Sequence, residues 1–252
     1  MRWFKADLHI HTVLSACAEL TMGPKDIVRA ALARGLDLIA VTDHNSAENV
    51  GAVIGAAEGT PLWVVPGMEV YTREEAHMIC LFETTEQALA FQEVIYDHLP
   101  EGDYDGELLG PQYVCDKDEH VLGENRRFLP FPVALTVHAV AGFVIDLGGI
   151  IYPAHIDRKS NSLLHSLGFI PGNLPLHAVE IAKPYDEAIR QLGFLQKSPY
   201  SIIRSSDAHD IDQLGGKYTF FKMDDLTFIE LKMAIEKRDG RCASLNREFN
   251  HA

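Results

Sequence analysis

The feature that most constrains this chain is the segment Asp7-Leu8-His9-Ile10-His11-Thr12 near its N-terminus. The apolar residues around it, from Trp3 to Ile10, predict a buried strand, and alternate side chains of a strand share one face. His9 and His11 therefore point the same way, about 7 Å apart, so that they can share one metal ion or bind neighbouring ions. A lone His-x-His pair can also be structural, so the interpretation depends on the rest of the chain.

Histidine and acidic residues recur where later apolar runs end, and in one case where a run starts. These residues are Asp43, His44, Glu69, His77, His155, Asp207 and His209, with His77 at the start of its run. The recurrence favours a metal site over histidines that merely form hydrogen bonds. A ligand set of imidazole, carboxylate and one thiol suits zinc, iron or manganese better than calcium, which prefers oxygen alone.

Apolar runs and amphipathic segments alternate along the chain. After the first strand, the pattern predicts strands at about 36–41, 62–65, 76–82, 150–155, 178–181, 201–204 and 218–222. It predicts helices at about 24–34, 46–58 (capped by Asn45 or Ser46), 84–98, 132–147, 161–167, 185–192 and 225–238.

This alternation implies parallel βαβ units. About seven such strands with polar residues at their ends favour an α/β fold that closes into a barrel, with the site at the C-terminal rim. An open doubly wound sheet is the alternative, but the glycine-rich phosphate fingerprint of that fold is missing after the first strand.

Residues 99–131 interrupt the alternation. The stretch from Glu101 to Glu107 is acidic and rich in turn residues, and Asp116, Asp118 and Glu119 follow it. Its Asp-x-Asp-Gly pattern resembles the start of a calcium loop, but the ligand series is not completed. We therefore expect a solvated insertion or lid within a single domain that spans residues 1–252.

The charge and cysteine content of the chain limit the kinds of partner and the location that we expect. The formal net charge of −14 argues against binding of long nucleic acid, because Lys and Arg supply most of that affinity. A small phosphorylated substrate stays compatible, because bound metal ions reverse the local field. The four scattered cysteines predict reduced thiols and a cytoplasmic location, without a signal peptide or membrane span. The oligomeric state is not indicated.

Five motifs in order resemble those of the PHP (polymerase and histidinol phosphatase) superfamily. They are Asp7-Leu8-His9-Ile10-His11-Thr12, Thr42-Asp43-His44, Gly67-Met68-Glu69-Val70, Pro153-Ala154-His155 and Ser206-Asp207-Ala208-His209. The resemblance implies a distorted seven-stranded (β/α) TIM-like barrel with two or three divalent ions of zinc, manganese or iron. It also implies a hydrolase that cleaves a phosphate ester with a metal-activated water, and we expect a small-molecule phosphomonoester as substrate.

The resemblance also implies a ligand set. His9, His11, Glu69 and Asp207 would hold a first ion, and Glu69 would bridge to a second held by His77 and His155. His44 and His209 would hold a third. Where the family often has another histidine, this chain has Cys17, which either ligates the third ion or is a packed thiol.

Further roles follow from position. We expect His209 to protonate the leaving group, and Asp43 and Asp7 to orient ligand imidazoles through the other ring nitrogen. Arg158, just after His155, is placed to bind a phosphate in a bidentate fork, and Lys159 is a weaker candidate. Residues read as rim, packing, structural or surface positions are Lys183, Arg204, His98, His120, His138, His165, His177 and His251.

Three other functions are compatible with this pattern. The first is a phosphodiesterase or nuclease that acts on nucleotides or nucleic-acid ends. The second is a non-catalytic metal-binding regulatory domain. The third is an amidohydrolase-type enzyme, which would need a metal-bridging lysine, and Lys183 is the one candidate that the pattern offers.

Overall fold

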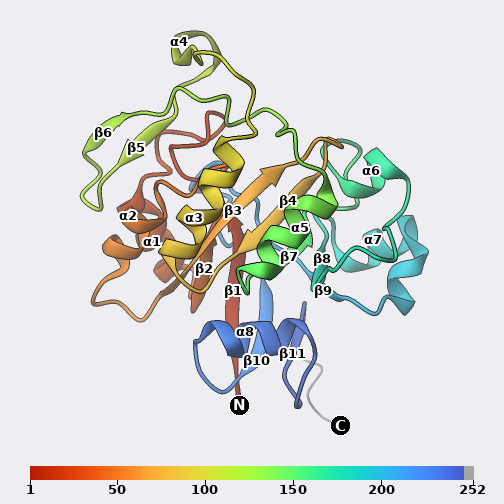
Figure 1. Ribbon diagram of the computed structural model, residues 1–252. Helices are drawn as coiled ribbons and strands as arrows, with labels where there is room; N and C mark the ends of the chain where they lie inside the picture. Colours follow the sequence, from red (N-terminus) through yellow and green to blue (C-terminus); the bar gives the residue numbers. More distant parts are fainter. Residues whose placement is uncertain (247–252) are drawn as a thin grey trace.

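A curled seven-stranded sheet forms the centre of the computed structural model, which describes residues 1–246 (Figure 1). In spatial order its strands are β11 (Cys242–Ser244), β10 (Thr219–Met223), β1 (Arg2–Ile10), β2 (Leu38–Val41), β3 (Trp63–Tyr71), β4 (His77–Leu81) and β7 (Ile150–Pro153). A separate parallel pair, β8 (Ala178–Glu180) and β9 (Ser201–Ile203), stands beside β7.

Backbone hydrogen bonds close these strands into a ring. His177 N donates to Ile151 O at 3.0 Å, which attaches the approach to β8 to β7. On the other side, Asp207 N donates to His9 O at 2.9 Å, which attaches the segment after β9 to β1. Strands β1, β2, β3, β4, β7, β8 and β9 thus surround one interior, and the expected distorted seven-stranded barrel is confirmed.

Part of the ring is antiparallel, which the expectation of parallel βαβ units missed. Strand β3 pairs antiparallel with β4, with Tyr71 opposite His77, and β4 pairs antiparallel with β7. The link at residues 72–76 is too short for a parallel crossover, which needs a dozen residues or more. The start of β4 therefore lies beside the end of β3, so His77 reaches the same rim as the other site residues.

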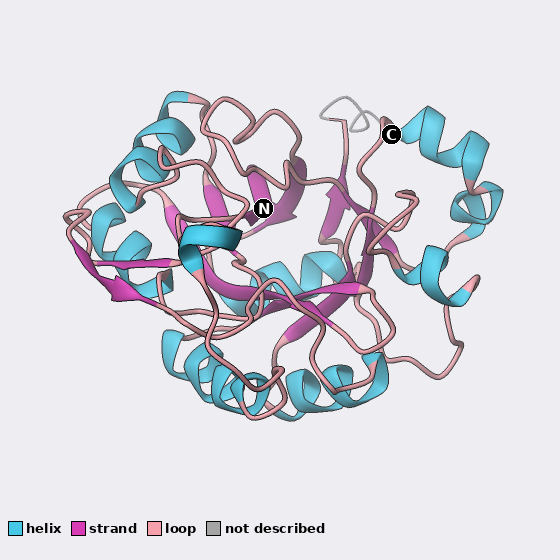
Figure 2. Cartoon of the chain, turned by 90° about the horizontal axis from the view of Figure 1, so that it is seen from above, coloured by secondary structure: helices cyan, strands magenta, loops and turns pink. Residues whose placement is uncertain are grey.

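Two apolar layers follow from the alternation of side chains along the strands. In β2, Leu38 and Ala40 pack into the barrel interior, while Ile39 and Val41 pack outward. The outer layer is covered by helices α1 (Pro24–Ala33), α2 (Val50–Ala57), α3 (Thr85–Tyr96) and α5 (Val137–Asp146). Helix α8 (Phe228–Ile235) packs on the interior cluster, at the end of the barrel opposite the rim (Figures 1 and 2). Smaller helices flank the β8–β9 pair: α6 (Leu163–Leu167), α7 (Tyr185–Gln191) and the 3-10 helix η1 (Gly193–Lys197).

One predicted helix start is wrong. Helix α2 begins at Val50, with Asn49 at its N-cap, and neither Asn45 nor Ser46 caps it. Asn45 has a φ of 50°, and its amide donates instead to the carbonyls of Leu129 (2.8 Å) and Phe131 (2.9 Å). These bonds tie the end of the insertion to the residue that follows His44. By contrast, Thr84 caps α3 with a full capping box.

Residues 99–131 contain α4 (Gly106–Leu109) and the antiparallel strands β5 (Tyr113–Cys115) and β6 (Val121–Glu124). Tyr113 N donates to Val13 O at 3.0 Å, so this segment lies beside the loop that follows β1. A role as a lid stays a prediction. Within residues 1–246 we find no helix with the length and hydropathy that a bilayer span requires.

Gly67 offers a test of the close packing of β2, β3 and β4. A Cβ at this position would lie 2.8 Å from Leu81 Cδ2 and 3.0 Å from Cys80 O. We expect Gly67→Ala to cost about 1–3 kcal/mol of unfolding free energy, because the neighbouring strands have no room to move. Gly51→Ala is the matched control, since nothing lies within 4 Å, and it should be neutral or up to about 1 kcal/mol stabilising. Equal denaturant midpoints for the two variants would contradict this packing.

Candidate metal centre

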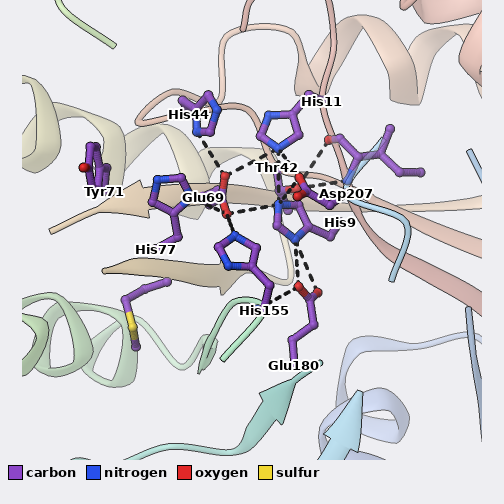
Figure 3. Close-up of polar contacts among 12 residues, drawn as sticks. His9, His11, Thr42, His44, Glu69, Tyr71, His77, His155, Glu180 and Asp207 are labelled. Atoms are coloured by element: carbon purple, nitrogen blue, oxygen red, sulfur yellow. Dashed lines mark hydrogen bonds and ion pairs between the residues drawn. The ribbon is translucent and has the colours of Figure 1, made fainter. Parts of the chain in front are cut away.

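The carboxylate of Glu69, on β3, lies at the centre of the rim among five imidazoles (Figure 3). Glu69 is only 1% exposed. Its Oε1 lies 2.8 Å from His77 Nδ1, 3.2 Å from His9 Nε2 and 3.3 Å from His155 Nε2. Its Oε2 lies 3.0 Å from His44 Nδ1 and 3.5 Å from His11 Nε2. The two oxygens thus face two different groups of histidines.

Asp207 approaches the same point from the segment after β9. Its Oδ1 lies 3.2 Å from both His9 Nε2 and His11 Nε2. The backbone bond from Asp207 to His9, described above, holds the two segments together. Residues 198 positions apart in the sequence, His9 and Asp207, are therefore neighbours, as their place in the sequence pattern predicted.

Among residues 1–246, three groups of side chains have ligand atoms within 4.8 Å of one another. They are His9, His11, Glu69 and Asp207; His44, Glu69 and His77; and His11, His44 and His209. The first group is the expected first set. The second contains His44 where the resemblance implied His155, although His155 also contacts Glu69 Oε1. The third adds His11 to the expected His44 and His209.

The residues present fit divalent cations. Both oxygens of Glu69, Nδ1 of His77 and Oδ1 of Asp207 are buried, and none has a hydrogen-bond partner among the described residues. Polar atoms buried without a partner cost free energy, and a bound cation removes that cost for several of them at once. Mixed imidazole and carboxylate donors match zinc, iron or manganese.

Electrostatics keep the carboxylates charged. Burial acts to raise the pKa of Glu69, but the imidazoles of His77 and His9 outweigh it and hold that pKa well below its usual range. The same competition, chiefly with His9, holds the pKa of Asp207 low. Burial, together with neighbouring His209 and His44, holds the pKa of His11 well below its usual range. Anionic carboxylates and a neutral imidazole are the forms that bind metal ions.

Backbone strain marks two of the ligand candidates. His155 has a φ of 30° and Asp207 a φ of 55°, in a region that residues other than glycine rarely adopt. Each such conformation costs about 1–3 kcal/mol and persists only where the surroundings enforce it. His155 N donates to Glu180 Oε1 at 3.1 Å, and Asp207 N to His9 O, so both are held in place.

Sequence reasoning missed Glu180, at the end of β8. This buried carboxylate accepts from His9 Nδ1, at 3.1 Å to Oε1 and 3.3 Å to Oε2, and from the backbone of His155. It fixes the proton of His9 on Nδ1 and leaves Nε2 to face Glu69 and Asp207. Its position at the end of the predicted strand 178–181 was the available signal.

Asp43 and Asp7 were expected to orient ligand imidazoles through the other ring nitrogen, but within residues 1–246 neither carboxylate has a hydrogen bond to an imidazole, so this prediction is wrong. Asp43 Oδ1 accepts from Thr12 N and Ser15 Oγ, both at 2.7 Å. Asp7 accepts from the backbone N–H groups of Ser206 (2.9 Å) and Gly215 (2.8 Å), and burial raises its pKa to about 6. Both carboxylates therefore hold loops: Asp43 the turn after β1, and Asp7 the segment that carries Asp207 and His209.

Cys17 lies at the edge of the centre. The residue is exposed and lies outside the three groups of ligand atoms described above, and the imidazoles of His209 and His44 are its electrostatic neighbours. Partial burial opposes ionisation, but the two imidazoles outweigh this effect and lower the thiol pKa to about 6. His209 is stacked on His11 with ring centroids 4.0 Å apart, and its Nδ1 donates to Asp207 O at 3.0 Å.

The basic residues that the sequence analysis singled out differ in whether they contact the metal centre. Arg158 Nη1 lies 2.6 Å from Asp207 Oδ2, and the arginine is 39% exposed. Lys159 is exposed beside it. Lys183 pairs instead with Gln191 and Glu187 at the surface, which removes it as a bridging lysine. The backbone N–H of Arg204 donates to Thr219 Oγ1.

The histidines that were read as structural or surface residues have their own contacts. His98 bonds Val94 O, His120 pairs with Asp116, His138 contacts Asn173, and His177 accepts from Ile151 N. The backbone N–H of His165 donates to the cap residue of α6, Ser162. His251 lies outside the described residues.

Comparisons with known proteins agree with this site. The family model of the PHP domain matches residues 7–122, which contribute the ligand candidates from His9 to His77. Residues 7–122 of this chain are thus similar to the PHP domain.

The uncharacterized Bacillus subtilis protein YqxK is 29% identical over 103 residues, which cover 39% of this chain and 26% of YqxK. The structure of the lesion-specific endonuclease PfuEndoQ from Pyrococcus furiosus matches 96% of this chain with a TM-score of 0.73 and 20% identity. This chain covers 58% of PfuEndoQ. PsfC from Pseudomonas syringae PB-5123 matches with a TM-score of 0.61 and 18% identity, over 98% of this chain and 93% of PsfC. These structural similarities establish the fold.

Glu180→Gln tests the support of His9. The amide keeps the shape but loses the charge that favours the Nδ1 proton of His9. We expect zinc affinity, measured by chelator competition, to fall about 10- to 100-fold. Glu230→Gln is the control, because Glu230 pairs with Arg241 away from the rim and its loss should leave zinc affinity unchanged. Wild-type affinity in Glu180→Gln would show that the contact is only structural.

Proposed function

We propose that this chain is a metal-dependent phosphoesterase that hydrolyses a phosphate ester with a metal-activated water. The observation that carries the proposal is the position of Glu69, whose two buried oxygens face two groups of imidazoles. A carboxylate placed in this way is suited to bridge two cations. Divalent ions bound here would polarise the phosphate oxygens and lower the pKa of the attacking water.

The residues divide into three sets of ligands. His9, His11, Glu69 and Asp207 would hold one ion. A second set would consist of Glu69, His77 and His44, with His155 beside Glu69 Oε1. The third would be His11, His44 and His209, with the Cys17 thiol as a further donor.

Arg158 would bind the phosphate group of the substrate. Its Nη1 is held by Asp207, and the exposed part of the guanidinium is free to donate to phosphate oxygens. Lys159 adds a second positive charge next to it. These two side chains offer an anion a favourable approach on a chain with a net charge of −14.

If the centre holds two ions, His209 is not a metal ligand, and we then assign to it the protonation of the leaving oxygen. His209 is 25% exposed, more than the neighbouring His44 at 12%. The hydrogen bond from its Nδ1 to Asp207 O orients the ring, so a proton on the other nitrogen can be delivered in a fixed direction.

A small phosphomonoester in the cytoplasm is the substrate that we favour. The insertion beside the β1 loop has a hollow of about 780 Å³ that includes Asp103, Asp105 and Glu107 among its lining residues. Arg126 also lines the hollow and pairs with Asp103, but the acidic side chains outnumber it and, like the net charge, repel a long polyanion. A small molecule that presents one phosphate to the rim avoids most of this repulsion.

Cleavage of a phosphodiester in DNA is a second candidate, and a specific observation favours it. Nearly the whole chain matches PfuEndoQ, and a second endonuclease Q structure holds a 27-mer duplex with an abasic lesion at the active site. A substrate panel separates the candidates. The panel contains small phosphomonoesters, dinucleotides and a duplex with an abasic site, each assayed with zinc, manganese and iron. Phosphate release from monoesters is the expected result. Cleavage of the duplex alone would favour the second candidate over the first. No turnover by metal-loaded protein would indicate a non-catalytic domain.

Glu69→Gln tests the bridging carboxylate. An amide keeps the shape but lacks the charge that two cations require. We expect turnover to fall by more than the roughly 10- to 100-fold seen for supporting residues of metal sites. Circular dichroism should show an unchanged fold. Turnover close to that of the wild type, with full metal content, would refute the bridging role.

Cys17 is a proposed ligand of the third ion. If so, Cys17→Ser should lower the bound metal by about one ion per chain, because a hydroxyl is a poor ligand for zinc or iron. Cys17→His should retain that ion. Cys242→Ser, in β11, is the control and should keep the full count. An unchanged ion count in Cys17→Ser would make Cys17 a structural thiol.

A further inference from the structure

The hydroxyl of Ser15 lies between two of the rim histidines and a buried carboxylate. Ser15 is 2% exposed and belongs to the turn after β1. Its Oγ donates to Asp43 Oδ1 at 2.7 Å. The same oxygen lies 3.0 Å from His11 Nδ1 and 3.2 Å from the backbone nitrogen of His44. One hydroxyl thus contacts two ligand candidates from neighbouring strands.

Hydrogen-bond accounting fixes the direction of each contact. A hydroxyl can donate only one hydrogen bond, and Ser15 donates it to Asp43, because an ionised carboxylate only accepts. The oxygen of Ser15 must therefore accept from both His44 N–H and His11 Nδ1. His11 consequently carries its proton on Nδ1, and its Nε2 lone pair is directed toward Glu69 and Asp207.

Asp43 is itself held rigidly. Thr12 donates to it twice, from its backbone N–H at 2.7 Å and from its hydroxyl at 2.8 Å. The position of Ser15 is thereby tied to the backbone that immediately follows His11. This arrangement lets one serine fix the tautomer of His11 and the main chain of His44 together.

We propose that Ser15 is a positioning residue of the metal centre, and that it acts most strongly on the group of His11, His44 and His209. Two of the three members of that group depend on Ser15, whereas one of the four members of the His9, His11, Glu69 and Asp207 group does. The proposal rests on the proposed function only in that metal ions bind at this rim.

Zinc binding by Ser15→Ala tests the proposal. The variant, the wild type and Ser201→Ala are compared by zinc count after dialysis and by chelator competition. Ser201 is a matched control, because it is equally buried and donates one hydrogen bond, to Ile235 O, at the start of β9. We expect Ser15→Ala to lose one ion, or to bind it about 10- to 100-fold more weakly, while Ser201→Ala binds zinc like the wild type.

The outcomes separate the two claims. If Ser15→Ala binds every ion with wild-type affinity, the positioning role is overturned and the proposed function stands. If the wild type binds no zinc, manganese or iron, the proposed function fails and this inference fails with it. The thermal midpoints of the metal-free variants show whether a lost ion reflects a lost fold. Similar midpoints for Ser15→Ala and Ser201→Ala would mean that the fold of Ser15→Ala is intact.

A measurement on the wild type keeps the proposal testable if Ser15→Ala does not fold. Nitrogen-15 NMR of the histidine rings in the zinc-loaded protein reports which ring nitrogen carries the proton. We expect His11 to be protonated on Nδ1, with Nε2 bound to zinc. A proton on Nε2 of His11 would overturn the role of Ser15.

Discussion

The buried negative charge of Glu69 is the constraint on which the rest of the centre depends. A carboxylate that is 1% exposed loses its hydration, and no hydrogen bond within the described residues replaces it. Five imidazoles surround the carboxylate instead, and they offset part of the cost by holding its pKa low. The remaining unpaired atoms leave donors that suit a bound cation. Fold and chemistry are therefore linked, because the strands must converge for this charge to be tolerated.

Loops and backbone hydrogen bonds, in addition to the strands, bring the ligand candidates together. The β3–β4 hairpin turns His77 toward Glu69, and backbone hydrogen bonds close the ring between β7 and β8 and between β9 and β1. Three buried carboxylates then hold the ligand candidates, and the segments that carry them, in place. Glu180 holds His9 and the strained His155, Asp43 holds the turn of Ser15, and Asp7 holds the segment of Asp207. The strained conformation of His155 is thus held by Glu180, and that of Asp207 by the backbone of His9.

Much of this could be predicted from the sequence, because strand periodicity and the ends of apolar runs are local signals. They placed His9, His11, Glu69 and Asp207 at one rim and identified the barrel. They placed Glu69 beyond its strand, whereas β3 runs on to Tyr71. They missed the antiparallel β4, since a five-residue link at 72–76 is not distinguished from a crossover by periodicity alone. They also misassigned Asp43 and Asp7, because hydrogen-bond partners depend on tertiary contacts that residue spacing does not encode.

Diffraction from zinc-loaded crystals, collected at the zinc absorption edge, tests the central claim most directly. We expect at least two anomalous peaks at the rim, with the two oxygens of Glu69 bound to different ions at about 2.0–2.2 Å. Imidazole nitrogens of His9, His11 and His77 should complete their coordination. Peaks that leave Glu69 without a metal neighbour, or that lie elsewhere on the protein, would contradict the bridging role of Glu69.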